Sequence, residues 1–201
     1  MVFLRNWHKW LGWVLVAQLI LWAVTGAVFI FKPGYGPAYE RPAVTFIPVT
    51  QEDIQRVATI AKANWQELRI LKTSVGEHLL VNTPEGIKHL NFSGEEQPPS
   101  PTSVKQLLHE SIAYNPNRYG KLKSIEGLVG ITSTGIELTL NWQQLTIRQQ
   151  GADSRLINLL YKLHYLQFTD NAFINKTLAT LALLFLVALS AFGVVISLCR
   201  K

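Results

Sequence analysis

The sequence is poor in cysteine and in charge. Cys199 is the only cysteine among 201 residues, so no disulfide can form within the chain. No group of cysteines and histidines has the spacing of a zinc site. Only 16% of the residues are charged, whereas an average soluble domain has roughly 25%. This composition argues against a disulfide-stabilised secreted module and indicates a membrane protein.

Several kinds of chemistry lack the residues that they need. The sequence contains no nucleophile elbow and no pair of carboxylates at an interpretable spacing, so hydrolytic activity has no support. No nucleic-acid partner is expected, because no long basic run is interleaved with aromatic residues. Four of the six net positive charges come instead from two basic tails that contain no acidic residue. Their basic residues are Arg5, Lys9, Arg200 and Lys201.

Charge is absent from two long apolar blocks, residues 10–31 and 178–199. At about 1.5 Å per residue, each block spans the roughly 30 Å hydrocarbon core of a bilayer as a helix. The first block is too long for the apolar region of a signal peptide, and no A-x-A-like cleavage site follows it. We therefore predict two transmembrane helices, the first an uncleaved anchor. Transport by this chain alone is not expected, because neither block contains a charged residue.

The charges outside the blocks predict how the chain is oriented. All 13 acidic residues lie between the two blocks, whereas both tails are basic. The positive-inside rule then places both tails in the cytoplasm and the intervening residues on the outer side. Trp7, Trp10 and Trp13 suit the inner membrane interface, and Tyr35 and Tyr39 suit the outer one.

The region between the blocks repeats one pattern. Thr50 and Asp53 resemble a capping box at the start of an amphipathic helix, and Ser100 followed by Pro101 resembles the start of another. Three strand-like segments follow each predicted helix, and after the second helix they are "KLKSIEGLVGI", "GIELTLNW" and "QLTIRQQG". The order helix-strand-strand-strand therefore occurs twice, with a period of about fifty residues. We predict an α+β membrane protein in which two similar units form the outer domain.

A third predicted helix precedes the second block. In "LINLLYKLHYLQF", Ile157, Leu160, His164 and Phe168 fall on one stripe, which indicates an amphipathic helix on the outer membrane surface. The predicted organisation is a cytoplasmic tail (1–9), transmembrane helix (10–32), linker (33–49), two units (50–99 and 100–152), interfacial helix (153–169), transmembrane helix (170–199) and cytoplasmic tail (200–201).

The first block and its flanks, "LRNWHKWLGWVLVAQLILWAVTGAVFIF", resemble the opening helix of PepSY-associated transmembrane proteins. The family pattern is a basic residue, an aromatic residue or leucine, histidine, a basic residue, and an apolar run ending in Thr/Ser-Gly. Those positions are occupied by Arg5, His8, Lys9, Gly12, Thr25 and Gly26. The repeated units resemble PepSY modules, and "LINLLYKLHYLQF" resembles the Leu-His-aromatic segment before a later transmembrane helix. The closing strand departs from the family pattern, since "LTIRQQGAD" keeps little more than the glycine.

The resemblance implies a bacterial cytoplasmic (inner) membrane protein with two transmembrane helices. Its two PepSY-like units, each a helix on an antiparallel sheet, would lie in an extracytoplasmic, periplasmic domain. Larger relatives, including siderophore-linked ferric reductases, have four membrane helices and hold haem b, which links the family to iron uptake. This chain has two such blocks, so the resemblance implies a complete electron pathway only for more than one copy.

His8 and His164 are the candidate haem ligands. His164 shares an apolar helical face, where an unpaired imidazole costs about 1–3 kcal/mol, so it needs a partner. That partner is a lipid headgroup, the outer end of the first block, or a cofactor. About 35 Å of helix separates His8 from the far end of the first block, whereas the axial nitrogens of one haem lie roughly 4 Å apart. Either a homodimer pairs each histidine with its copy, or both histidines are structural.

Small residues in both blocks allow close helix packing; they are Gly12, Gly26, Ser190, Gly193 and Ser197. They serve a homodimer or pack the two helices of one chain together, and we favour the second interpretation. The other histidines, His78, His89 and His109, are expected at the surface or partly buried.

Two main hypotheses of function follow. In the first, the bilayer anchors an accessory protein whose outer domain binds a protein or peptide partner through a strand edge or a groove. In the second, a homodimer is a haem-b redox component of the ferric-reductase kind, as the resemblance implies. Modulation of a secreted protease is a third hypothesis, supported by family analogy alone.

Overall fold

The protein, described here for residues 2–199 by a computed structural model, forms two units. The helical unit contains residues up to Tyr35 and from Asp153 onward. The central unit contains Gly36–Ala152 and holds two antiparallel sheets. The predicted α+β class, with apolar helices flanking a sheet-containing region, is confirmed.

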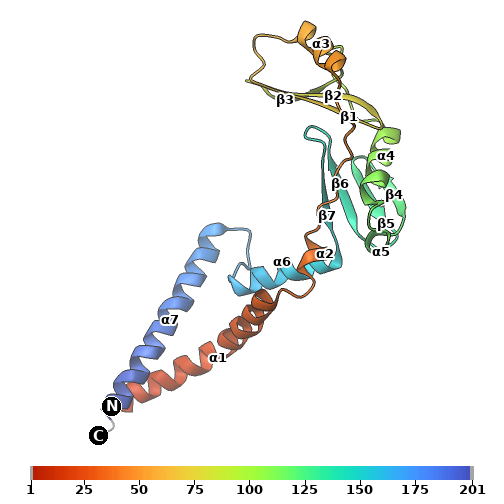
Figure 1. Ribbon diagram of the computed structural model, residues 1–201. Coiled ribbons are helices and arrows are strands. Elements are labelled where there is room, and N and C mark those ends of the chain that lie inside the picture. The colour runs from red at the N-terminus through yellow and green to blue at the C-terminus, as the bar shows by residue number, and fades with distance from the viewer. Residues whose placement is uncertain (1, 200–201) are drawn as a thin grey trace. The chain divides into compact units, whose positions relative to one another are not determined.

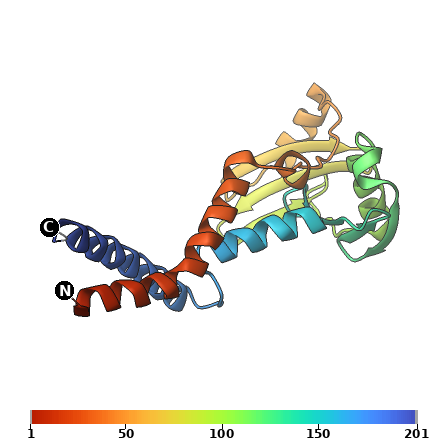
Figure 2. The ribbon, with the colours of Figure 1, turned by 90° about the horizontal axis from the view of Figure 1, so that it is seen from below.

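The helical unit is formed by three helices: α1 (Val2–Phe31), α6 (Ala152–His164) and α7 (Ala172–Leu198). Helices α1 and α7 run in opposite directions, so the start of α1 lies near the end of α7, and from there the two helices diverge (Figure 1; Figure 2 shows them from below). Both helices are long and apolar enough to cross a membrane. No residue of α7 is buried within the protein, as expected of a helix whose apolar side chains contact lipid rather than a protein core.

The first half of the central unit packs one helix on a three-stranded sheet. Its elements are α3 (Gln51–Ile60), β1 (Glu67–Thr73), β2 (Gly76–Thr83) and β3 (Gly86–Leu90). The predicted capping box is confirmed, because the Thr50 hydroxyl accepts from the Asp53 amide while the Asp53 carboxylate accepts from the Thr50 amide. Val57 of α3 packs with strand residues of the sheet in a small apolar core.

The second half repeats this plan with an additional strand. Its elements are α4 (Pro101–Ile112), α5 (Pro116–Tyr119), β4 (Leu122–Glu126), β5 (Val129–Thr132), β6 (Glu137–Asn141) and β7 (Thr146–Gln150). Ser100 caps α4 with Pro101 in its first turn, as predicted. The segment expected to be a single strand, "KLKSIEGLVGI", is a hairpin. Gly127 turns the chain there with a φ of 55°, a conformation that glycine adopts without strain.

The sheet of the first half is covered on both faces. Four consecutive residues of β2, His78 to Val81, are buried, although neighbouring side chains of a strand point to opposite faces. Leu79 and Val81 pack in the core with α3. His78 points the other way, toward the ring of Trp142, which follows β6 in the second half. The two halves therefore share a buried interface within the central unit.

Candidate functional site

His8, near the start of α1, is bound to α7. Its Nδ1 lies 3.1 Å from the carbonyl oxygen of Leu189. A carbonyl oxygen only accepts, so the imidazole carries its proton on Nδ1 and keeps its lone pair on Nε2. Gly193 makes room for the ring, because a Cβ at this position would lie 3.2 Å from His8 Cε1. Of the two interpretations of the small residues, Gly193 therefore confirms the favoured one, which is packing between the two helices of one chain.

His164, the last residue of α6, is bound to α1. Its Nδ1 lies 2.7 Å from Thr25 Oγ1. The Thr25 hydroxyl has one proton, which it donates to the Leu21 carbonyl oxygen at 2.6 Å, so it accepts from His164 Nδ1–H. Trp22 Nε1 donates to the His164 carbonyl oxygen at 2.8 Å. Of the three predicted partners for His164, the structure shows the first apolar helix.

The two imidazoles share a feature of metal-binding histidines. Each donates from Nδ1 to an oxygen, as metal-ligating histidines do with the nitrogen that does not bind the metal. Among the described residues, neither His8 Nε2 nor His164 Nε2 has a hydrogen-bond partner. The lone pair on each Nε2 suits an axial position of a haem iron. No group of three or more metal-ligating side chains occurs in the described part of the chain.

His8 and His164 lie too far apart along α1 to bind the same haem. His8 lies near the start of α1. His164 lies beside Thr25, which is about 25 Å further along the same helix. One haem needs two axial nitrogens roughly 4 Å apart. A single chain thus offers one imidazole at each of two levels, and a haem site with two histidines requires a second copy.

His78 and His89 form a buried chain of hydrogen bonds. His89 Nδ1 donates to the Trp142 carbonyl oxygen at 2.7 Å. His89 Nε2 therefore accepts from His78 Nδ1 at 2.8 Å, and His78 Nε2 accepts from the Thr73 hydroxyl at 2.7 Å. Both rings are fully paired while they are neutral. The prediction of a surface or partly buried position is wrong for His78 and His89, which are 0% and 7% exposed. It is confirmed for His109, which is exposed.

Burial keeps this histidine pair uncharged. Desolvation, followed by repulsion from His89, lowers the pKa of His78 to about 4. Desolvation also lowers the pKa of His89, and its hydrogen bond to Trp142 opposes that shift. The Trp142 ring stacks on His89 with ring centroids 4.7 Å apart. At neutral pH, this hydrogen-bonded pair therefore holds the two halves of the central unit together without a charge.

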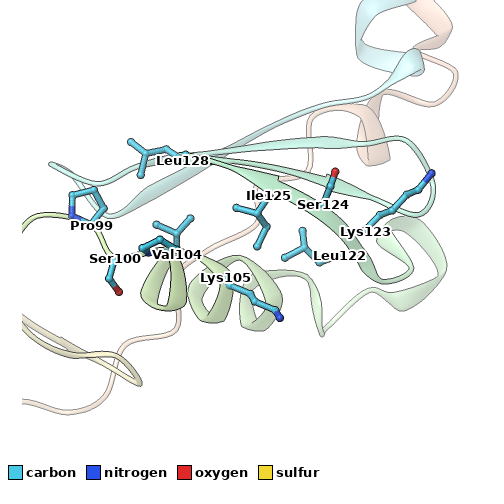
Figure 3. A pocket seen from close by; sticks show the side chains of 11 residues that line it. Pro99, Ser100, Val104, Lys105, Leu122, Lys123, Ser124, Ile125 and Leu128 are labelled. Atoms are coloured by element: carbon cyan, nitrogen blue, oxygen red, sulfur yellow. The ribbon is translucent and has the colours of Figure 1, made fainter.

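A groove of about 600 Å³ lies between α4 and β4. Val104 of α4 and Leu122, Ile125 and Leu128 on the sheet side form its apolar wall (Figure 3). β4 pairs only with β5 among the described strands, so the other edge of β4 is unpaired. The groove thus combines apolar side chains with the free backbone groups of an edge strand.

A β-bulge produces this wall. Leu122 pairs with Thr132 while Ser124 pairs with Ile131, so Lys123 is an extra residue in β4. In a regular strand, side chains three positions apart point to opposite faces. The extra residue restores the alignment, and Leu122 and Ile125 both pack against the core of the second half.

The charged residues that line the groove are both basic. They are Lys105 on α4 and Lys123 on β4, and no acidic residue among those described lines the groove. Figure 3 shows both ammonium groups pointing away from the apolar wall, so the side chains contribute aliphatic surface to the groove and charge to its rim. No sequence pattern predicts this groove. The alternation of lysine with leucine in "KLK" was the only signal of an exposed basic strand.

Comparisons with known proteins place the chain in a family. The family model described as the PepSY-associated TM region matches residues 1–200. The match includes both apolar helices and the whole central unit. No curated protein and no solved structure matches the chain.

Proposed function

The chain belongs to the PepSY-associated transmembrane family, and we propose that it is a membrane-anchored accessory protein whose central unit binds a protein or peptide partner. Two apolar helices anchor it as a two-pass membrane protein. The basic tails favour a cytoplasmic position for both termini, which would put the central unit in the periplasm of a bacterial cell.

The groove between α4 and β4 supports this function most directly. A concave, mostly apolar surface with a few polar groups at its rim is typical of a binding site. An unpaired strand edge beside such a surface offers main-chain hydrogen bonds as well.

Site-specific photo-crosslinking in the cells that produce the protein tests this proposal. The photoreactive residue replaces Lys105 or Lys123 at the groove, or the exposed Lys62, which lies after α3. We expect a discrete covalent adduct of one reproducible mass from at least one position in the central unit. If no exposed position of the central unit yields an adduct, the proposal of a macromolecular partner fails.

A second candidate function is that of a haem-b redox component, which we propose for a homodimer. It is favoured by the hydrogen bonds that fix Nδ1 of His8 and His164 as donors and leave Nε2 available. In a dimer, two copies of His8 would hold one haem and two copies of His164 the other. Haem bound there supplies one-electron redox chemistry. The chain itself orients the four imidazoles through Leu189 and Thr25.

The visible spectrum of the protein tests this candidate. The protein is purified in mild detergent from haem-sufficient cells, and its spectrum is recorded oxidised and reduced. We expect a Soret band and an α band, with about half of the haem lost in His8→Ala or in His164→Ala and none in the exposed control His109→Ala. The absence of both bands, or full haem content in both variants, excludes the two-site dimer.

A further inference from the structure

We propose that the groove between α4 and β4 receives an extended acidic segment of the partner, which adds as a new strand to the free edge of β4. This inference rests on the proposed partner-binding function and specifies the chemistry of the partner. Addition of a strand satisfies the unpaired N–H and C=O groups of an edge strand, while alternate side chains enter the neighbouring groove.

The geometry of β4 suits such a segment. β4 is five residues long, so a partner segment of about five extended residues, roughly 17 Å, covers its edge. On one face of the added strand, side chains would point toward the layer that contains α4. There they would meet the apolar wall of Val104, Ile125 and Leu128. Apolar residues at alternate positions are therefore expected in the partner segment.

The charge at the groove selects an acidic partner. Lys105 and Lys123 line the groove, and Lys121 directly precedes β4. None of the three forms a salt bridge with an acidic side chain of the described chain. These unpaired ammonium groups would attract carboxylates of an incoming strand.

The same features disfavour pairing with another copy of β4. Lysine residues and bulges on an edge strand are known devices against indiscriminate strand pairing. A parallel, in-register pair of two β4 strands would bring Lys121 and Lys123 of one chain against the same residues of the other, and like charges on paired strands are destabilising. Bulge and charge together thus disfavour pairing of β4 with its own copy, while they leave the edge open to a strand of opposite charge.

Peptide binding to the full-length protein in nanodiscs of zwitterionic lipid tests the inference. The probe is a fluorescein-labelled ten-residue peptide of alternating glutamate and valine. Two comparison peptides replace every glutamate by lysine or every valine by serine. Fluorescence anisotropy measures each Kd at low and at physiological salt. We expect the glutamate–valine peptide alone to bind, and its affinity to fall with added salt.

Single charge reversals locate the bound peptide. Lys105→Glu and Lys123→Glu are each expected to raise the Kd by about fivefold, whereas the matched reversal Lys62→Glu on another exposed segment leaves it unchanged. Circular dichroism confirms that each variant is folded. The inference is overturned if the lysine–valine peptide binds as tightly as the glutamate–valine peptide. It is also overturned if the three charge-reversal variants bind the glutamate–valine peptide with the same Kd.

Two further outcomes separate this inference from its premise. Crosslinks in cells that arise only from Lys62, together with no peptide binding, retain the partner-binding function and reject the groove. Concentration-dependent self-association that Lys123→Glu alters would assign the edge to a second copy of the chain and also overturn the inference. Sedimentation of the protein in detergent measures this self-association.

Discussion

At the scale of single residues, the pair formed by His78 and His89 couples the fold of the central unit to pH. Each ring nitrogen has a partner only while both rings are neutral. The pKa of His78 is about 4 in the folded protein, against its ordinary value of 6.5. Between these values the unfolded chain binds a proton that the folded chain does not. Stability is therefore complete above pH 6.5 and is lost as the pH falls toward 4, by on the order of 3 kcal/mol.

Thermal unfolding in detergent, followed by circular dichroism between pH 7.5 and 4.5, measures this effect. We expect the Tm to fall with pH and to fall less steeply in His78→Gln, whose amide stays neutral throughout. His109→Gln is the matched control, because His109 is exposed. The comparison uses only the slope of Tm against pH, because His78→Gln also lowers the Tm at neutral pH. Parallel curves for His78→Gln and the unsubstituted protein would refute the assignment.

The hydrogen bond between Thr25 and His164 gives a second prediction at this scale. Thr25→Val keeps the shape of the side chain but removes the oxygen that accepts from His164 Nδ1. A double-mutant cycle of Thr25→Val and His164→Phe in detergent is expected to show a coupling free energy of about 1 kcal/mol. Strictly additive effects on the free energy of unfolding would mean that this contact does not stabilise the docking of α6 on α1.

At the scale of elements, glycine decides how closely α1 and α7 approach. A Cβ at Gly193 would lie only 3.2 Å from His8 Cε1, so a larger side chain there would press on the His8 ring, whereas a Cβ at Gly26 meets no described atom of its own chain within 4 Å. We expect Gly193→Leu to lower stability by about 1–3 kcal/mol through overpacking, and Gly26→Leu to be nearly neutral. The Tm in detergent compares these two variants. A neutral Gly193→Leu would show that the helices are not held together at this point.

Which elements the sequence predicts depends on how local their causes are. The starts of α3 and α4 are predicted because their signals are local. Thr50 and Asp53 accept from each other's backbone amides, and Ser100 accepts from the amide three residues further on. Pro101 lacks an amide N–H that would need a partner in the first turn. The hairpin of β4 and β5 was missed because its bulge breaks the alternation of apolar residues. A bulge is defined by the pairing of two strands, which a single strand's pattern does not contain.

At the scale of the whole molecule, the contacts of the candidate sites are remote in sequence. His8 and Leu189 are 181 positions apart, His164 and Thr25 are 139 apart, and His89 and Trp142 are 53 apart. The sequence indicated that His164 needs a partner, because its helical stripe is apolar. It did not indicate burial of His78 and His89, since that depends on a second half covering the outer face of the first sheet. Polar residues in a strand are ordinarily taken as its solvent-facing positions.

The distribution of charge over the whole chain predicts its orientation in the membrane. Both tails are basic, and every acidic residue lies between the two apolar helices, so the tails are expected on the cytoplasmic side. Cysteine labelling tests this directly, because the exposed Cys199 is the only native thiol.

For the central unit, Ser93→Cys introduces a thiol at an exposed position in a Cys199→Ser background. A membrane-impermeant maleimide applied to intact spheroplasts is expected to label residue 93 at once and Cys199 only after permeabilisation. The two single-cysteine proteins control for each other, since each contains one reactive site on an opposite side of the membrane. Labelling of Cys199 before permeabilisation, with residue 93 protected, would put the groove in the cytoplasm. The acidic partner segment would then have to be sought among cytoplasmic proteins.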